Sequence, residues 1–214
     1  MTGTLEKTQE EILDAAVRHV PFDGWSLHAW MRGAADAGVA SDDSRRLYPG
    51  GSGAMIACHN RLADQRMLAA LEKRDLDGLR VRERIALAVR VRLEQAAGDR
   101  EAVRRGLSLL ALPLNAPLAT RLLYRTVDAI WLAAGDQSTD YNYYTKRALL
   151  AGVYGAVLLY WLNDRSEGCA DTWSFLDRRI ADVMKAPKLM AAPGRLLRYL
   201  PNPAKLFRRR VKWA

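Results

Sequence analysis

The side chains most often used in catalysis and metal binding form no recognised constellation in this chain. The three histidines, His19, His28 and His59, lack metal-ligand spacing, and the adjacent Cys58 and His59 have no second pair to complete a zinc site. The sequence also lacks a glycine-rich phosphate loop, a nucleophile elbow and the Glu-x-x-His pairs of a di-iron centre. It therefore predicts no catalytic residues, no metal site and no cofactor, and it disfavours an enzyme.

Aromatic side chains gather instead around a polar turn within Asp128–Arg147, DAIWLAAGDQSTDYNYYTKR. Gly135 is placed to end one helix, because glycine adopts the left-handed conformation at low cost. Residues 136–140 hold four side chains suited to cap the next helix. Because adjacent helical residues point about 100° apart, Tyr143 and Tyr144 are not both expected to be buried on one face. The pattern indicates a recognition or ligand-positioning surface, and packing within the fold is the alternative.

Two segments, residues 119–134 and 149–162, are apolar around most of the circumference of the helix that each would form. The second segment has one side of small residues, which leaves room for a ligand or for a close helix neighbour. Pockets for apolar ligands commonly lie between such helices. This pattern does not distinguish a ligand pocket from tight packing between the two helices. The residues expected to line the pocket are Leu122, Leu123, Val127, Ile130, Trp131, Ala151, Gly152, Gly155 and Ala156.

The excess positive charge lies entirely at the C-terminus. Residues 185–214 hold nine basic and no acidic side chains, while the other 184 residues carry 24 of each, for a net charge of +9. Basic residues beside large apolar ones suit an anionic membrane surface. A nucleic-acid arm and a solubilising end are the alternatives, and the large apolar residues disfavour the first. The residues expected to contact the membrane are Arg195, Leu196, Leu197, Arg198, Leu200, Lys205, Leu206, Phe207, Arg208, Arg209, Arg210 and Trp213.

Composition predicts where the protein resides. Half of the residues are apolar, which supports a sizeable core without disulfides, and two cysteines suggest a reducing compartment. The N-terminus, MTGTLEKTQEEIL, lacks a signal-peptide core and is too acidic for a transit peptide. Residues 148–162 fall short of the roughly 20 that a membrane span needs, so they predict a buried helix. We expect a bacterial cytoplasmic protein, peripheral on the inner face of the cytoplasmic membrane, or a mature form that is already processed.

Helical periodicity runs through the chain, with no convincing alternating strand, so the sequence predicts an all-α fold. Ser26 as an N-cap and Gly38 as a stop frame one helix, and Pro49 with its two following glycines ends another. Proline is expected to break the chain into short pieces from Pro187 onward. The expected helices span residues 5–20, 26–37, 41–47, 52–74, 80–96, 101–110, 114–134, 139–162 and 172–184.

The run SLLALPLNAPLATRLLYRTVDAIWLAAGDQSTDYNYYTKRALLAGVYGAVLLYWLND, followed by DTWSFLDRRIADVM, resembles the coenzyme Q biosynthesis protein 9 family. The resemblance covers Ser108–Met184 and is most specific in AGDQSTDYNYYTKRA, residues 134–148. It implies a tetracycline-repressor-like fold and a non-catalytic, lipid-binding accessory role in ubiquinone biosynthesis. Such a protein would bind isoprenoid quinone precursors or lipids at the membrane and present them to a hydroxylase of the pathway.

The resemblance also implies a partner surface. Ile130, Tyr143 and Tyr144 match family positions that form a hydrophobic patch for docking the hydroxylase. The family often has methionine at the first and tryptophan at the second position, so this chain keeps the apolar or aromatic character with less contact area. The fold further implies a homodimer through the last two body helices.

On this layout, residues 1–60 form a helix-turn-helix-like head, 61–184 a lipid-binding and dimerisation body, and 185–214 a membrane-binding tail. The rival function is a lipid-responsive transcription regulator. Met1–Asn60, however, holds five basic and eight acidic residues, and Asp42 and Asp43 would face phosphates at the start of the recognition helix. DNA affinity depends on phosphate neutralisation, so the sequence predicts a structural relic and disfavours DNA binding.

Overall fold

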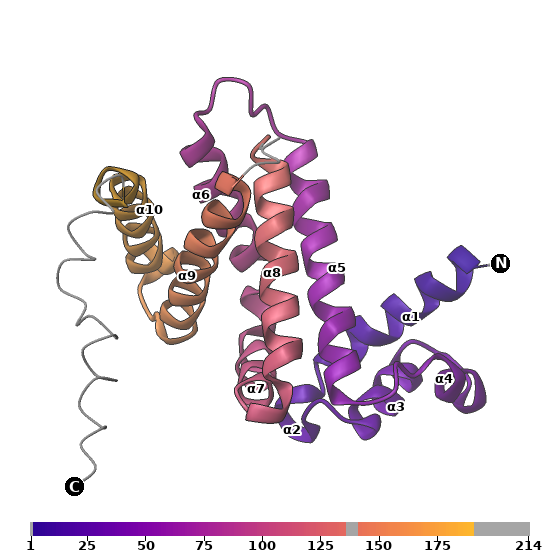
Figure 1. Cartoon of the computed structure of the whole chain (residues 1–214). Helices are drawn as coiled ribbons and strands as arrows, with labels where there is room; N and C mark the ends of the chain where they lie inside the picture. Colours follow the sequence, from indigo (N-terminus) through magenta and orange to yellow (C-terminus); the bar gives the residue numbers. More distant parts are fainter. Residues whose placement is uncertain (1, 136–140, 191–214) are drawn as a thin grey trace, which may run out of the picture.

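The computed structural model describes residues 2–135 and 141–190, and every regular element in these residues is helical, which confirms the all-α prediction. Figure 1 shows a small group of helices near the N-terminus beside a larger bundle. The first group comprises α1 (Thr2–Val17), α2 (Val20–Asp23), α3 (Leu27–Asp36) and α4 (Ser41–Leu47). The larger bundle comprises α5 (Ser52–Glu72), α6 (Val81–Gln95), α7 (Arg100–Leu110), α8 (Ala116–Ala133), α9 (Tyr141–Asn163) and α10 (Ala170–Met190), with 3-10 turns η1 (Ala97–Asp99), η2 (Pro113–Asn115) and η3 (Glu167–Cys169).

The head, residues 1–60, is organised by a close crossing of α1 and α3. A Cβ added at Gly33 would lie 2.4 Å from the backbone nitrogen of Ala16, so only glycine lets the two helices approach this closely. Ser26 caps α3 as expected, accepting a hydrogen bond from the backbone N–H of Ala29. The fully buried Trp30 donates its indole N–H to the backbone carbonyl of Ser44 at 2.9 Å, which holds α4 against α3.

Helix α5 continues without a break through residue 60, the expected head–body boundary. The apolar core of the head is completed by residues from the body, namely Leu62, Ala102 and Leu122. Trp25 also donates its indole N–H to the carbonyl of Ala102 in α7 at 3.0 Å. Head and body are therefore fused through a shared helix and a shared core.

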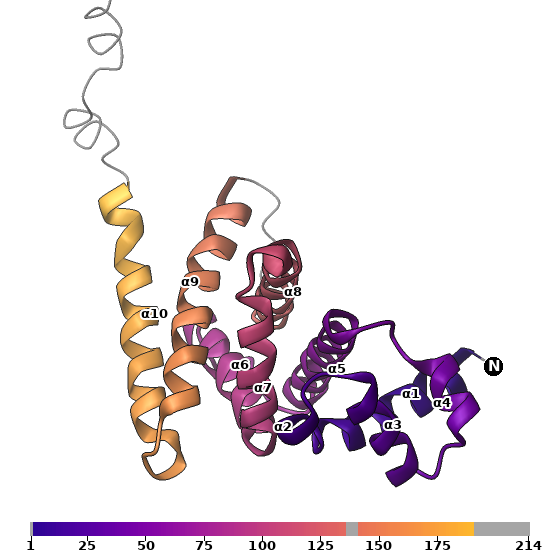
Figure 2. The ribbon, with the colours of Figure 1, turned by 90° about the horizontal axis from the view of Figure 1, so that it is seen from below.

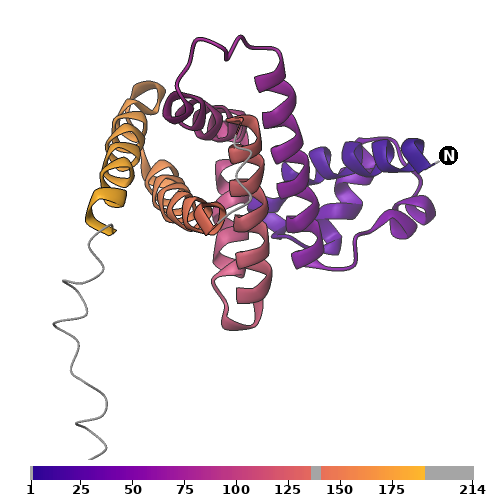
Figure 3. The same cartoon turned by 45° about the horizontal axis from the view of Figure 1, so that its top comes forward.

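The body positions its helices as a ring. Helices α6, α8, α9 and α10 contact one another in cyclic order, as Figure 3 shows. Figure 2 shows α9 and α10 side by side, on the far side of the body from the head. The apolar stripe of α10, which includes Leu176 and Ile180, packs against the body core. This stripe therefore serves the internal core, and a homodimer through the last two body helices stays a prediction.

The turn between α9 and α10 is fixed by Asp164. Its carboxylate accepts hydrogen bonds from the backbone and hydroxyl groups of both Ser166 and Thr172. Burial alone would raise the pKa of Asp164, but these hydrogen bonds lower it well below its usual range. The side chain of Arg100 reaches the carbonyl of Asp164 at 2.7 Å and lies over the ring of Trp161, so α7 braces the same turn.

Helix α10 extends to Met190, six residues beyond its expected end, and Pro187 lies inside it. The expectation that Pro187 breaks the chain is wrong, because the helix continues through it and loses only the hydrogen bond that the missing N–H would have made.

Among the described residues no single helix has the length and apolarity of a membrane span. The pair Ala97–Leu110 and Pro113–Ala133, which is bent by 96°, has them only when the two segments are taken together.

Candidate functional site

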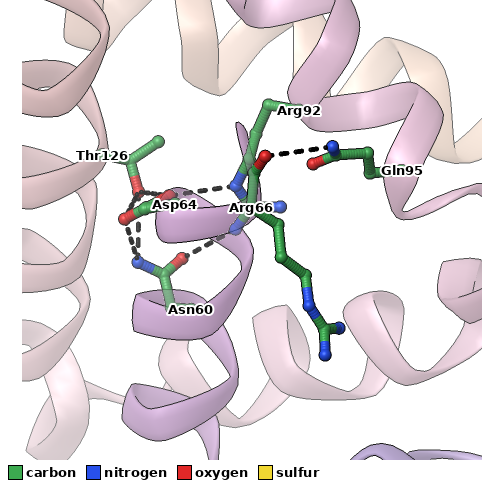
Figure 4. A network of polar contacts seen from close by, with 6 residues as sticks. All are labelled: Asn60, Asp64, Arg66, Arg92, Gln95 and Thr126. Carbon is green, nitrogen blue, oxygen red and sulfur yellow. Dashed lines mark hydrogen bonds and ion pairs between the residues drawn. The ribbon is translucent and has the colours of Figure 1, made fainter. Parts of the chain in front are cut away.

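A buried polar network joins three helices in the middle of the molecule. Figure 4 shows Asp64 of α5 between Arg92 of α6 and Thr126 of α8, with Asn60 one turn away on α5. Arg92 Nε donates to Asp64 Oδ1 at 2.9 Å, and the Thr126 hydroxyl donates to Asp64 Oδ2 at the same distance. Asn60 donates to Asp64 Oδ2 at 3.0 Å and accepts from Arg92 Nη2 at 3.4 Å. The arginine charge is therefore compensated inside the protein.

This network sits in an apolar environment, which sets its electrostatics. Only 8% of Asp64 and 5% of Arg92 are exposed. Burial raises the pKa of Asp64, and the ion pair with Arg92 opposes that shift. His59, on the same helix as Asp64, has its pKa lowered to about 4 by burial first and then by the charge of Arg92. Near neutral pH the region thus holds one compensated ion pair and a neutral imidazole.

A small cavity adjoins the network where head and body meet, and we call it the junction pocket. Its volume is about 70 Å³. The polar network, α9 and the head all contribute to its walls, together with leucines from α6, α7 and α8. Its lining includes Trp25, Ile56, His59, Asn60, Arg92, Leu93, Leu107, Leu122, Tyr154, Leu158 and Trp161.

A larger cavity, the apolar pocket, lies inside the ring of α6, α8, α9 and α10. Its volume is about 330 Å³. Trp131 lies at the end of α8, and the ammonium group of Lys146 lies 5.5 Å from the centre of its ring. The walls combine these two residues with Val81, Arg82, Ile85, Gly135, Leu149, Leu150, Val153, Ile180 and Val183.

The structure brings only part of the predicted lipid-binding set to a cavity. Leu122 lines the junction pocket and Trp131 the apolar pocket. Val127 and Ile130 are fully buried in the body core, and Leu123 packs against it. On α9, Ala151, Gly155 and Ala156 are half-buried and Gly152 is exposed.

The small side of α9 does not face α8. A Cβ added at Gly152 or Gly155 would meet no atom within 4 Å. The helix instead buries the large side chains that recur every three or four residues, and these form its contact with the body core. Sequence reasoning missed this stripe, although its spacing was a usable signal: Leu150, Val153, Tyr154, Val157 and Trp161.

One of the three residues of the predicted docking patch is not at the surface. Ile130 is fully buried, so the expectation that it lies on the surface is corrected. It occupies the inward face of α8 with Val127 and Trp131, one turn apart. Tyr144 is 67% exposed on the first turn of α9. The Tyr143 side chain lies outside the described part of the structure.

The predicted membrane-binding residues, Arg195 to Trp213, also lie outside the described residues. Among the residues that are described, no group of three or more His, Cys, Asp or Glu side chains could hold a metal ion. Both cysteines, Cys58 and Cys169, are half-buried free thiols.

Comparison with known proteins gives a family match within the body of the molecule. Residues 116–187 match the COQ9 family model. The chain is 38% identical over 190 residues to the mitochondrial ubiquinone biosynthesis protein COQ9 of Rattus norvegicus, and 37% identical to that of Homo sapiens. The match covers 84% of this chain and 59% of the rat protein, so the chain spans less than two thirds of the relative's length.

A solved structure supports the fold. The crystal structure of a TetR transcriptional regulator from Nitrosomonas europaea matches with a TM-score of 0.67, covering 82% of this chain and 97% of that one. At 24% sequence identity this likeness shows the fold alone.

The location expected from the sequence is contradicted. The similar COQ9 proteins of rat, human, cattle and Drosophila melanogaster are mitochondrial, and they overturn the prediction of a bacterial cytoplasmic protein. That prediction rested on the acidic N-terminus, and this feature did not indicate the compartment in which the relatives reside. The resemblance to the COQ9 family is confirmed by the family model and by these sequences, on a tetracycline-repressor-like fold.

Proposed function

We propose that this protein is a non-catalytic accessory protein of ubiquinone biosynthesis that holds a lipid or an isoprenoid quinone precursor in the apolar pocket. The relatives' role in ubiquinone biosynthesis supports the pathway. The observation that carries lipid binding is the pocket of about 330 Å³ within the ring of α6, α8, α9 and α10. That volume is at the lower end of small-molecule pockets, which suits a segment of an apolar chain.

The chemistry of the lining favours such a ligand. Leu149, Leu150 and Val153 on α9 face Ile85 on α6 across a cavity to which Trp131 adds a large aromatic wall. Two basic residues, Arg82 and Lys146, also line it. An apolar cavity with a few basic groups fits a ligand that has an apolar chain and a polar or anionic end.

Filling the apolar pocket should remove the ligand. We expect Leu149→Trp to lower the amount of lipid that co-purifies with the protein at least fivefold, because the indole occupies the space of the chain. Overpacking is expected to cost about 1–3 kcal/mol of stability, which leaves the protein folded. The measurement is mass spectrometry of an organic extract, normalised to protein.

Gly152→Leu is the matched control, because it adds bulk to the same helix where a Cβ meets open space. This variant should keep the lipid of the unchanged protein. Absence of lipid from the unchanged protein, or equal lipid in Leu149→Trp, would contradict the proposal.

We further propose that the protein presents its ligand to a hydroxylase of the pathway through the start of α9. Tyr144 supports this, because it is an exposed aromatic residue on the first turn of α9. The same helix lines the apolar pocket through Lys146 and Leu149. Tyr144→Ala should weaken binding to the hydroxylase about tenfold, or about 1.4 kcal/mol, without changing the melting temperature. Tyr124→Ala, which removes another exposed tyrosine from α8, is the control. Titration by surface plasmon resonance measures both, and equal affinities for all three proteins would move the docking surface elsewhere.

A further inference from the structure

The junction pocket contains two polar side chains that the fold itself does not use. Tyr154 is 95% buried by area, since only 5% of it is exposed, yet among the described residues its hydroxyl makes no hydrogen bond. The ring of His59, which is half-buried, also has no hydrogen-bond partner there, and it rests against Trp25 with 5.3 Å between ring centroids. Buried polar groups are usually hydrogen-bonded, so the unpaired hydroxyl of Tyr154 and the indole nitrogen of Trp161, which is buried without a partner in the same lining, point to a ligand.

The charges around the pocket favour an uncharged ligand. Among the described residues, Arg92 is the only cationic side chain in the lining, and its charge is compensated by Asp64 at 2.9 Å. His59 is neutral near pH 7, because burial and Arg92 lower its pKa to about 4. An anion would therefore find no uncompensated cation, and a cation would meet the guanidinium group of Arg92 without an unpaired carboxylate.

Size and walls define the rest of the ligand. Leu93, Leu107, Leu122 and Leu158 surround the polar groups with apolar surface. A cavity of about 150 Å³ accommodates benzene, so a cavity of about 70 Å³ accepts a smaller group, the end of a longer molecule. The imidazole and the phenol can each donate and accept one hydrogen bond, which matches a hydroxyl or carbonyl oxygen.

We propose that the junction pocket binds the uncharged, oxygen-bearing end of an apolar molecule, an alcohol or a carbonyl compound, through Tyr154 and His59. This site is separate from the apolar pocket, which shares none of its lining residues. Because Trp25 and His59 come from the head side and Tyr154 from the body, the ligand would contact both parts of the molecule.

Titration of the full chain with 1-hexanol tests the proposal. Trp25 and Trp161 line the pocket, so their indole N–H signals in proton–nitrogen NMR spectra should shift in a saturable way. Tyr154→Phe and His59→Asn should each raise the Kd for 1-hexanol at least fivefold. Hexanoate and hexylammonium should bind at least tenfold more weakly than the alcohol, since neither charge is compensated.

Matched controls separate this site from general apolar binding. Tyr160→Phe removes a hydroxyl from the same helix outside the pocket, where the ring stacks on Phe175, and should leave the Kd unchanged. Leu149→Trp should also leave it unchanged, so a failed lipid test and a failed hexanol test remain distinguishable. Thermal melts show whether each variant is folded. If Tyr154→Phe does not fold, the Kd of His59→Asn decides the test. Non-saturable shifts, equal affinity for hexanoate, or unchanged Kd values in the folded pocket variants would each overturn the proposal and leave bound water as the occupant.

Discussion

Replacing Arg92 with methionine is expected to lower the free energy of unfolding by about 3–5 kcal/mol, the usual effect of removing one partner from a buried ion pair. Asp64 would remain buried with its charge, keeping only the hydrogen bonds from Thr126 and Asn60. Urea denaturation measures this loss as a lower midpoint at an unchanged slope. Arg90→Met is the matched control, because Arg90 pairs with Glu94 at the surface and should cost no more than about 1 kcal/mol.

The loss should depend on pH and on Asp64. In Arg92→Met the pKa of Asp64 would rise further, because burial already raises it and the opposing ion pair is gone. For an acid whose pKa is raised by folding, the penalty is complete above the folded pKa and disappears as pH falls to the unfolded value, near 4. The variant should therefore be closest to the unchanged protein at pH 4. Adding Asp64→Leu should restore most of the stability at pH 8. A loss below 1 kcal/mol, or a double variant no better than the single one, would contradict this account.

Deleting residues 191–214 is expected to reduce binding to phosphatidylserine vesicles at least a hundredfold. We propose that this segment binds the membrane, and the deletion removes seven basic side chains, each worth about 1 kcal/mol near an anionic surface. Residues 2–190 keep both apolar cores, so the melting temperature should not change. Vesicle sedimentation measures the binding, which should also weaken in the full chain as salt rises.

A second variant tests the contribution of the apolar residues. Leu206→Ser with Phe207→Ser keeps every charge and should lose part of the binding, whereas a purely electrostatic tail would lose none. Binding to phosphatidylserine that is unaffected by the deletion would reject the membrane role. Strong binding of the full chain to a nucleic acid, lost on deletion, would instead favour the alternative of a nucleic-acid arm.

The helices were predictable because local signals fix them. Helix α4 has the expected bounds, since Pro49 and two glycines follow it, and Ser26 caps α3 as its side chain suggested. The end of α10 was missed because Pro187 predicts a break, yet the helix runs through it to Met190. The family's fold followed from a specific run of residues, and residues 116–187 carry that match.

The candidate sites were harder to predict because they depend on helix rotation and on pairs distant in sequence. Gly152 and Gly155 suggested a ligand face, yet α9 turns its large residues inward and leaves the small ones against open space. Arg92 and Asp64 lie 28 residues apart, and nothing local marks them as partners. His59 has no motif at all, and only the folded structure places it in the lining of one pocket with Tyr154.

The continuous course of α5 has a consequence for any attempt to dissect this protein. A fragment that ends at residue 60 would lose Leu62, Ala102 and Leu122 from its core and would cut a helix in its first half. The complementary fragment would begin in the middle of the same helix and would lack Asn60, the residue that bridges Arg92 and Asp64. The repressor-like head can therefore be recognised by its shape, but it cannot be moved as a separate unit. Exchanging it for the head of a true repressor would require a junction on the C-terminal side of Asp64.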